Sequence, residues 1–318
     1  MQAAVVSSFQ SPPQYDTFSD PVAGEGEVLV TVSAAGLHQI VRSLASGTHY
    51  MSTGNLPFIP GLDGAGRLED GTRVYFAMAR PPFGTFAERC VAKRAMCLPI
   101  PDSLDDVTVA AMMNPALSSW AALSERAHFV AGESILILGA TGVAGQLAVQ
   151  VAKRLGARRI VGAGREPEVL KTLTGLGADS TVSLSQSAND LVAAFRQEWD
   201  KEGIDVVLDY LWGAPAEALL SAITKSKAAA ARVRYVQVGA MAGANISLPA
   251  ATLRSTGLEI LGSGFTGGSI AKLFESMRQF LQTAAQEPFQ IKTKSAPLSE
   301  VESLWNVAQN GARLVFEP

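Results

Sequence analysis

The sequence predicts an α/β protein with two domains, one built on a doubly wound parallel sheet and the other on a compact, β-rich sheet. The chain has 318 residues, whereas a typical domain has ~100–200. Beyond about residue 105, short apolar runs alternate with segments of helical pattern, which is typical of a parallel sheet covered on both faces. Before that point, short β-branched runs are separated by glycine and proline.

The β-rich part contains three expected strands, at 28–32, 73–76 and 86–91. The second follows the turn Asp70-Gly71 and the third follows Gly84. Short strands separated by such glycine-containing turns indicate a barrel-like sheet.

Six apolar segments are expected to form the parallel sheet, a number that fits a doubly wound nucleotide-binding domain. They lie at 135–138, 159–162, 181–184, 206–209, 235–238 and 258–261. Helices are expected at 109–123, 143–155, 167–176, 188–199 and 270–283, and a last strand at 313–316. We expect the tail to return to the first domain. The predicted division is therefore 1–113 with 265–318, and 114–264.

Composition and charge exclude some partners. The net charge is −3, which argues against a broad grip on nucleic acid or an anionic membrane. No stretch approaches the ~20 apolar residues of a membrane span, and the first residues lack a basic segment followed by an apolar run. The two cysteines, Cys90 and Cys97, are expected to be free thiols in a reducing compartment. A cytoplasmic location is the expectation.

The glycine-rich turn at 137–145 (Ile-Leu-Gly-Ala-Thr-Gly-Val-Ala-Gly) follows an apolar strand and opens a helix. In that context Gly142 lets the backbone approach a pyrophosphate, and Gly145 lets the helix pack on the strand. The first glycine of the common fingerprint is Ala140 here, so a tight structural turn without a cofactor stays open as an alternative. The expected dinucleotide contacts are Ala140, Thr141, Gly142, Val143, Ala144 and Gly145.

The choice between NAD and NADP depends on the end of the second strand. Gly164 and Arg165 stand where an acidic residue would bind the ribose 2′-hydroxyl of NAD. A guanidinium suits a 2′-phosphate, so we expect NADP(H). Because Glu166 follows, a solvated surface arginine is the alternative.

Three further stretches carry a family resemblance: Gly-Leu-Asp-Gly-Ala-Gly at 61–66, Ser-Ser-Trp-Ala-Ala-Leu at 118–123 and Gly-Ala-Arg-Leu-Val-Phe at 311–316. With the glycine-rich turn, they resemble the quinone oxidoreductase-like members of the medium-chain dehydrogenase/reductase superfamily over nearly the whole chain. The resemblance implies a GroES-like catalytic domain, an NADP-binding Rossmann domain and a homodimer paired through the strand near Leu258.

The zinc-dependent members of that superfamily carry metal ligands where this chain has His38, Leu62-Asp63 and Asn114. Only His38 and Asp63 offer metal-binding side chains, whereas a catalytic zinc needs about three. We therefore expect no metal. Without a Lewis acid the site suits acceptors that are already electrophilic, namely quinones and α,β-unsaturated carbonyls.

The resemblance implies three candidate catalytic residues: His38, Tyr50 and Asn114. His38 could donate a hydrogen bond or a proton near the nicotinamide, and the Tyr50 phenol could donate to the acceptor oxygen. A buried histidine bound to backbone and a rim aromatic are the respective alternatives. Asp63 is expected to hold neighbouring loops rather than to act as a base.

The remaining cofactor contacts are expected at the carboxyl ends of the strands. They are Gly239, Ala240, Met241, Ser263, Gly264 and Phe265, which the resemblance assigns to the ribose and nicotinamide. Ser118, in the expected helix 109–123, is a further cleft-lining candidate, and Arg313 is a candidate for the phosphates, with a surface arginine as its alternative.

Two other functions compete with a quinone or enone reductase. One is an NADPH-binding protein with little turnover, in a crystallin-like role. The other, a zinc alcohol dehydrogenase, is disfavoured by the missing ligands.

Overall fold

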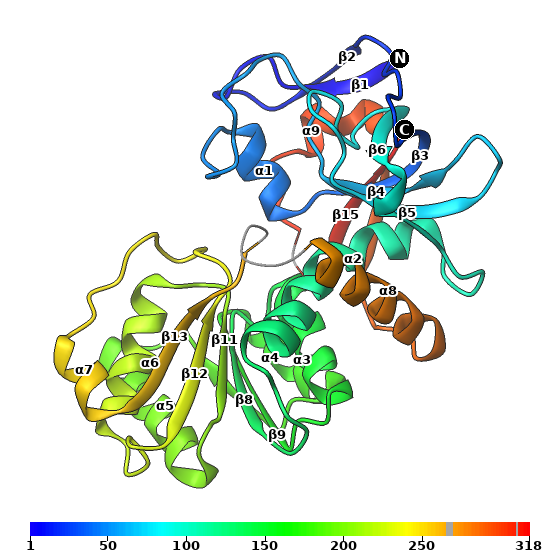
Figure 1. Ribbon diagram of the computed structural model, residues 1–318. Coiled ribbons are helices and arrows are strands. Elements are labelled where there is room, and N and C mark those ends of the chain that lie inside the picture. Colours follow the sequence, from blue (N-terminus) through cyan, green and yellow to red (C-terminus); the bar gives the residue numbers. More distant parts are fainter. Residues whose placement is uncertain (265–269, 310) are drawn as a thin grey trace. The chain divides into compact units, whose positions relative to one another are not determined.

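The computed structural model describes residues 1–264, 270–309 and 311–318 (Figure 1). Its contacts divide the chain into two compact units, which we call unit 1 (Met1–Pro115 and Met277–Pro318) and unit 2 (Ala116–Ser276). The divisions fall inside two helices, α2 (Asp106–Ala121) and α8 (Ile270–Gln286). The two units are described separately below.

Unit 2 contains a six-stranded parallel sheet in the order β10-β9-β8-β11-β12-β13. The strand order reverses between β8 and β11, as in doubly wound nucleotide-binding sheets, so the predicted fold class is confirmed. The strands are β8 (Ser134–Leu138), β9 (Arg159–Gly164), β10 (Ser180–Ser183), β11 (Val206–Asp209), β12 (Arg232–Gln237) and β13 (Gly257–Gly262).

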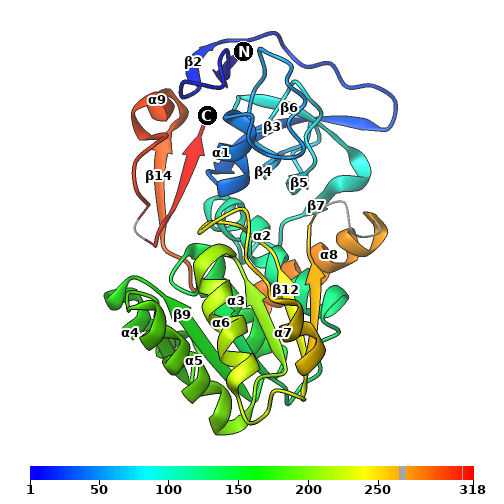
Figure 2. The ribbon, with the colours of Figure 1, turned by 90° about the vertical axis from the view of Figure 1, so that its left-hand side faces the viewer.

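Helices cover both faces of this sheet (Figure 2). One face packs against α5 and α6 through a core that includes Leu136, Val207, Phe195 and Trp199. Helices α3 and α4 contact β8, β9 and β10. The helices are α3 (Val143–Arg154), α4 (Pro167–Leu176), α5 (Ala188–Glu202), α6 (Gly213–Lys225) and α7 (Ala250–Ser255).

The backbone register brings the carboxyl ends of the central strands to one level. Leu138 pairs with Ala163 on one side and with Asp209 on the other, and Asp209 pairs with Gln237. The segments that follow β8, β9, β11 and β12 therefore leave the sheet at the same edge, where ligands of doubly wound sheets bind.

The start of α3 packs directly on the end of β8. A Cβ atom at Gly145 would collide with the carbonyl oxygen of Gly139 and lie 2.5 Å from the Cα atom of Ala140. Gly139 itself has φ +90°, which favours glycine. Both glycines are required by the turn, whatever it binds.

Unit 1 contains a seven-stranded sheet with the path β14-β15-β3-β4-β5-β7, in which β6 also pairs with β3. A separate hairpin joins β1 (Gln2–Val5) and β2 (Gln14–Thr17). The sheet strands are β3 (Glu27–Gly36), β4 (Asp63–Arg67), β5 (Arg73–Ala77), β6 (Arg89–Lys93), β7 (Cys97–Pro99), β14 (Thr293–Pro297) and β15 (Arg313–Glu317).

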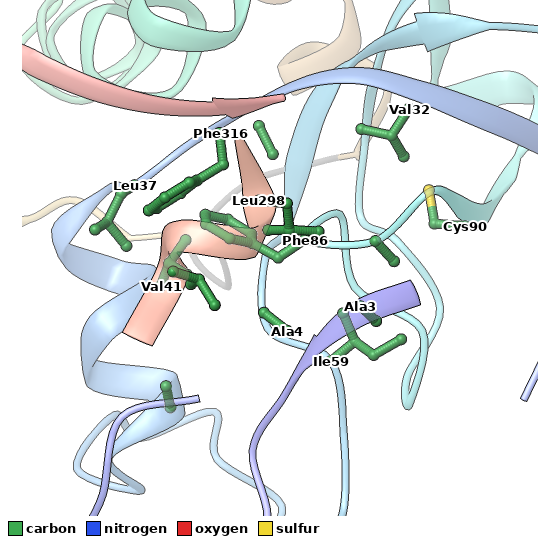
Figure 3. Close-up of a cluster of buried hydrophobic side chains, with 14 of the residues drawn as sticks. Ala3, Ala4, Val32, Leu37, Val41, Ile59, Phe86, Cys90, Leu298 and Phe316 are labelled. Carbon is green, nitrogen blue, oxygen red and sulfur yellow. The ribbon is translucent and has the colours of Figure 1, made fainter. Parts of the chain in front are cut away.

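Residues from both ends of the chain build the core of unit 1 (Figure 3). Phe86 and Phe316 lie with their ring centroids 5.7 Å apart, beside Leu37, Val41 and Leu298. The chain therefore returns to its first part at Met277, whereas the predicted return was at 265. Short helices complete the unit: α1 (Gln39–Ala45), α9 (Val301–Leu304) and the 3₁₀ turns Arg94–Met96 and Leu298–Glu300.

Several predicted elements need correction. Helix α2 begins at residue 106 and ends at 121, and a π-helical turn (Ala122–Arg126) replaces the expected end at 123. Strand β6 begins at Arg89 rather than at 86. The sequence reading missed α6, the hairpin β1–β2 and β14. Among the described residues, no helix combines the length and the apolar character that crossing a membrane requires.

The two cysteines are free thiols. Cys90 is 0% exposed, and burial raises the pKa of its thiol far above the ordinary value. Burial also raises the pKa of Cys97 to about 11.

The Gly145 contact gives a stability prediction. Gly145→Ala should lower the free energy of unfolding by about 2 kcal/mol, because overpacking a close contact costs ~1–3 kcal/mol. Gly175→Ala, in α4, is the matched control, because a Cβ atom there meets nothing within 4 Å, and an alanine inside a helix should add ~0.5–1 kcal/mol. Denaturant unfolding measures both. Equal stability of the two variants would contradict this account of the turn.

Candidate functional site

The strongest candidate site in unit 2 is the turn from Gly139 to Gly145. It is anchored by two backbone bonds, because the N–H groups of Gly139 and Ala140 donate to the Ala163 carbonyl at 2.9 and 2.8 Å. Gln146 Nε2 also donates to the Thr141 carbonyl at 3.1 Å. The first N–H groups of a helix have no intrahelical acceptor and, with the helix dipole, attract an anion.

Gly142 differs from Gly139 and Gly145 because the fold does not require it. It is exposed, its φ of −75° and ψ of 162° suit any residue, and a Cβ atom would meet only the Gly139 carbonyl oxygen, at 3.4 Å. A side chain at this position would instead fill the space in front of the first turn of α3. This is the cradle that a pyrophosphate needs.

Arg165 directly follows β9 and is exposed. No ion pair joins it to Glu166 or to another described carboxylate, so its guanidinium is available. Gly164 packs on Thr141 of the glycine-rich turn, since a Cβ atom at 164 would overlap the Thr141 side chain. Arg165 is therefore held next to the turn, in the position expected to select NADP.

Other predicted cofactor residues lie at the same edge of the unit 2 sheet. Met241 N donates to the Tyr210 carbonyl at 3.3 Å, and Ser263 N donates to the Gln237 carbonyl at 2.8 Å. Gly239 packs tightly on Tyr210, because a Cβ atom there would lie 2.8 Å from the Tyr210 carbonyl oxygen. Ala240, Met241 and Gly264 are exposed, whereas Phe265 lies outside the described residues.

Ser118 is half-buried on α2, and its hydroxyl lies 3.2 Å from the hydroxyl of Tyr210. Burial raises the pKa of Tyr210 to about 12, so this phenol stays protonated and serves as a hydrogen-bonding group. Tyr210 was not predicted.

Unit 1 holds a buried polar cluster around Asp63, at the start of β4. Its Oδ2 accepts from Tyr75 Oη at 3.1 Å and its Oδ1 from Asn114 Nδ2 at 3.3 Å. Burial raises the pKa of Asp63 to about 7, against the smaller opposing effects of Tyr75, Asn114 and the Arg313 charge. The expectation that Asp63 holds neighbouring segments agrees with these bonds to β5 and α2, and a pKa near neutrality also lets it exchange a proton.

His38 lies beside this cluster, with Nε2 3.8 Å from Asp63 Oδ2. It is 2% exposed. The Ala110 carbonyl acts on the ring as a backbone acceptor, although neither ring nitrogen meets full hydrogen-bond geometry with a described residue. Burial, and next the charge of Arg313, lower the pKa of His38 well below its ordinary value. The imidazole is thus neutral at neutral pH and carries one donor and one acceptor, neither of which is in a well-formed hydrogen bond within this part of the chain.

His38 and Asn114 both lie beside the buried carboxyl of Asp63. Tyr50 and Arg313 make other contacts. Tyr50 is 67% exposed and stacks on His49 with ring centroids 4.2 Å apart. Arg313 is buried in unit 1 and is the first residue of β15, where its Nη1 donates to the Leu37 carbonyl at 2.6 Å. A contact of Arg313 with cofactor phosphates remains a prediction.

Among the described residues, no group of three His, Cys, Asp or Glu side chains is placed to hold a metal ion. The donors around Asp63 are instead a phenol and an amide. Sequence reasoning missed Tyr75, which follows an ordinary strand pattern. It also missed Ser185, whose hydroxyl donates to the Arg165 carbonyl at 3.3 Å. Neither residue belongs to a motif that would have singled it out.

Comparisons with known proteins agree with this geometry. The family described as zinc-binding dehydrogenase matches residues 143–286. That segment contains α3 and most of unit 2 but neither His38 nor Asp63, so the match bears on the dinucleotide-binding part and not on metal ligands.

Two relatives and one solved structure illustrate the likeness. The probable NADPH-dependent quinone reductase tdiC of Emericella nidulans is 28% identical over the full length of both chains. The quinone oxidoreductase of Rattus norvegicus is 31% identical over 225 residues, 66% of each chain. The quinone oxidoreductase of Thermus thermophilus, also solved as a complex with NADPH, is 27% identical, has a TM-score of 0.83 and covers 100% of both chains.

The raised pKa of Asp63 predicts a pH dependence of stability. Because the pKa rises from 3.8 to about 7 on folding, its contribution is fully present below pH 3.8 and is lost as the pH rises through 7. Relative to Asp63→Asn, the wild-type free energy of unfolding should therefore fall by about 4 kcal/mol between pH 4 and 8, at ~1.4 kcal/mol per pK unit. Urea unfolding across this range measures it, and parallel curves would mean an unperturbed carboxyl.

Proposed function

Because the chain belongs to the quinone oxidoreductase-like branch of the medium-chain dehydrogenase/reductase superfamily, we propose that it transfers hydride from NADPH to a quinone or another activated α,β-unsaturated carbonyl. The predictions of an oxidoreductase and of NADP(H) as its cofactor are confirmed by the relatives. The acceptor of this particular chain is the part that we propose.

One observation carries the proposal: an unfilled cradle beside an available guanidinium. Gly142 leaves open the space before α3, and Arg165 extends from the adjacent strand end with no described carboxylate paired to it. A structural turn with no ligand would have no need of glycine at 142, since its backbone conformation suits any residue.

The residues of unit 2 would bind and orient the cofactor. The N–H groups at the start of α3 would hold the pyrophosphate, and Arg165 would form charge-assisted hydrogen bonds to the 2′-phosphate. Ser118, Gly239, Ala240, Met241, Ser263 and Gly264 would contact the ribose and nicotinamide. When bound, NADPH supplies the hydride.

The residues of unit 1 would serve the acceptor. Hydride addition to a conjugated carbonyl places negative charge on its oxygen, so a donor held at that oxygen lowers the barrier. We propose His38, neutral and without a well-formed hydrogen bond at either ring nitrogen, as that donor, with Asn114 and Tyr50 as further candidates. Asp63, whose pKa is about 7, could return a proton to the cluster at neutral pH. Only His38 and Asp63 here offer metal-binding groups, fewer than a catalytic zinc needs, so we propose a metal-free reaction.

We also propose that unit 1 is the GroES-like catalytic domain and unit 2 the NADP-binding Rossmann domain.

A homodimer through β13 is proposed as well: β13 is the edge strand of its sheet, and Ile260 on it is 37% exposed. Light scattering tests that dimer. The two free thiols favour a cytoplasmic location, which cell fractionation would test.

The test of function is NADPH oxidation by the purified chain against a panel of quinones and enals. Turnover with at least one member, unchanged by a chelator, is expected. Tight NADPH binding without turnover on the whole panel would instead favour the crystallin-like binding role. Loss of turnover with chelator would contradict the metal-free reaction and favour a metal-dependent one.

Arg165→Ala should raise the dissociation constant of NADPH about 10- to 100-fold, because hydrogen bonds to a charged group are worth ~1.5–3 kcal/mol. NADH lacks the 2′-phosphate, so its affinity should stay within about twofold by the same argument. Fluorescence titration measures both, with Glu166→Ala as the neighbouring control that leaves NADPH affinity unchanged. Equal weakening of NADH and NADPH would contradict the assignment.

Gly142→Val should weaken NADPH about tenfold or more, because an isopropyl group would occupy the phosphate cradle and overpacking costs ~1–3 kcal/mol. The apo protein should keep its circular dichroism spectrum, since the backbone at 142 accepts a β-branched residue. An unaltered titration curve would place the pyrophosphate elsewhere.

A further inference from the structure

In the turn that joins β11 to α6, Trp212 has a backbone conformation that is normally found only for glycine. Trp212 has φ 54° and ψ −160°, a region that residues other than glycine occupy only when the surroundings force them. The turn follows the central strand β11, at the edge where the cofactor residues lie. Strained backbone of this kind concentrates at functional sites.

The buried carboxylate of Asp209 holds the turn in this conformation. Its Oδ1 accepts from the N–H groups of Leu211 at 2.7 Å and Trp212 at 3.0 Å, while Tyr235 Oη donates to its Oδ2 at 2.7 Å. Asp209 is 0% exposed, so placing a carboxylate there requires these donors. The indole of Trp212 packs against the Tyr235 ring, with centroids 6.2 Å apart.

The turn between β11 and α6 contacts both segments that are expected to bind the cofactor, namely the glycine-rich turn and the segment after β12. On one side, Tyr210 and Leu211 crowd Gly139: a Cβ atom there would lie 3.3 Å from Tyr210 Cβ and 3.2 Å from Leu211 Cδ2. On the other side, the Tyr210 carbonyl accepts from Met241 N at 3.3 Å, and the Leu211 carbonyl accepts from Ala242 N at 2.7 Å. The turn is therefore a spacer between the segments that follow β8 and β12.

We propose that Asp209 is a positioning residue for NADPH: by holding Trp212 in a glycine-like conformation, it fixes the spacing between the glycine-rich turn and the 239–242 segment, and with it the affinity of these two segments for the nicotinamide nucleotide. The inference rests on the proposed function. If the carboxylate were lost, Trp212 would relax toward negative φ, and the hydrogen bonds to Met241 and Ala242 would shift with it.

A rescue experiment tests this mechanism. Asp209→Asn leaves only a neutral, weaker acceptor at Oδ1 and places an amide donor where Oδ2 now accepts from Tyr235 Oη and Trp212 N, so the NADPH dissociation constant should rise about tenfold. The KM for NADPH should rise in parallel, while kcat at saturating NADPH and the KM for the acceptor should change less than twofold. Adding Trp212→Gly should restore NADPH affinity to within about threefold of wild type, since glycine adopts this conformation without strain.

His128→Gly in the Asp209→Asn background is the matched control. His128 also has positive φ, at 49°, but precedes β8 at the opposite edge of the sheet, so it should restore nothing. If Asp209→Asn does not fold, a comparison of Trp212→Ala with Trp212→Gly tests the positioning role instead. Both variants lose the indole, but only alanine keeps a side chain at a positive φ and therefore the backbone strain. Trp212→Gly should bind NADPH about fivefold more tightly than Trp212→Ala and unfold at a higher temperature.

The outcomes separate the two proposals. A wild-type chain that ignores NADPH would remove the proposed function and this inference with it. A wild-type chain that binds NADPH, with Asp209→Asn binding equally well or with no rescue by glycine, would overturn the positioning role alone. Equal affinity and stability of Trp212→Ala and Trp212→Gly would overturn it in the same way.

Discussion

The nucleotide site that we propose in unit 2 depends on one close contact, between the carbonyl of Gly139 and the unsubstituted Cα of Gly145. Because no side chain separates them, α3 starts directly against the end of β8, and its free N–H groups point beyond the sheet edge. The neighbouring strand ends are level with β8 through the parallel register. Arg165 and the segment after β12 can therefore serve one ligand only while this contact is kept.

The sequence predicted the alternating core of unit 2 well, because strands buried on both faces are continuous apolar runs. The prediction failed at elements whose local sequence is not typical of the structure that they form. Helix α6 begins with Gly213 and includes Pro215, two residues that usually mark a loop. Strand β14 is polar and largely exposed, and it forms only because β15 offers a parallel edge. Edge pairing of this kind is a tertiary property that no local pattern carries.

The sequence could single out candidates where chemistry and local backbone coincide, as at Gly142 and Arg165, whose role in binding stays a prediction. It was not predictable where long-range packing defines a residue. Tyr75 looks like any strand aromatic until β4 places Asp63 against its hydroxyl. Arg313 precedes an apolar run and was expected to reach the cofactor phosphates, with a surface arginine as the alternative. It is buried and donates to the Leu37 carbonyl, 276 residues earlier. Sequence alone does not reveal such partners.

The state of the two thiols bears on the reactivity of the proposed substrates. Quinones and enals arylate or alkylate thiolates, so an enzyme that reduces them risks modification by its own substrates. With a pKa of about 11, Cys97 is ionised at neutral pH in roughly one molecule in ten thousand. Cys90 is shielded from solvent altogether. The two cysteines thus offer electrophiles of the proposed class almost no thiolate at neutral pH.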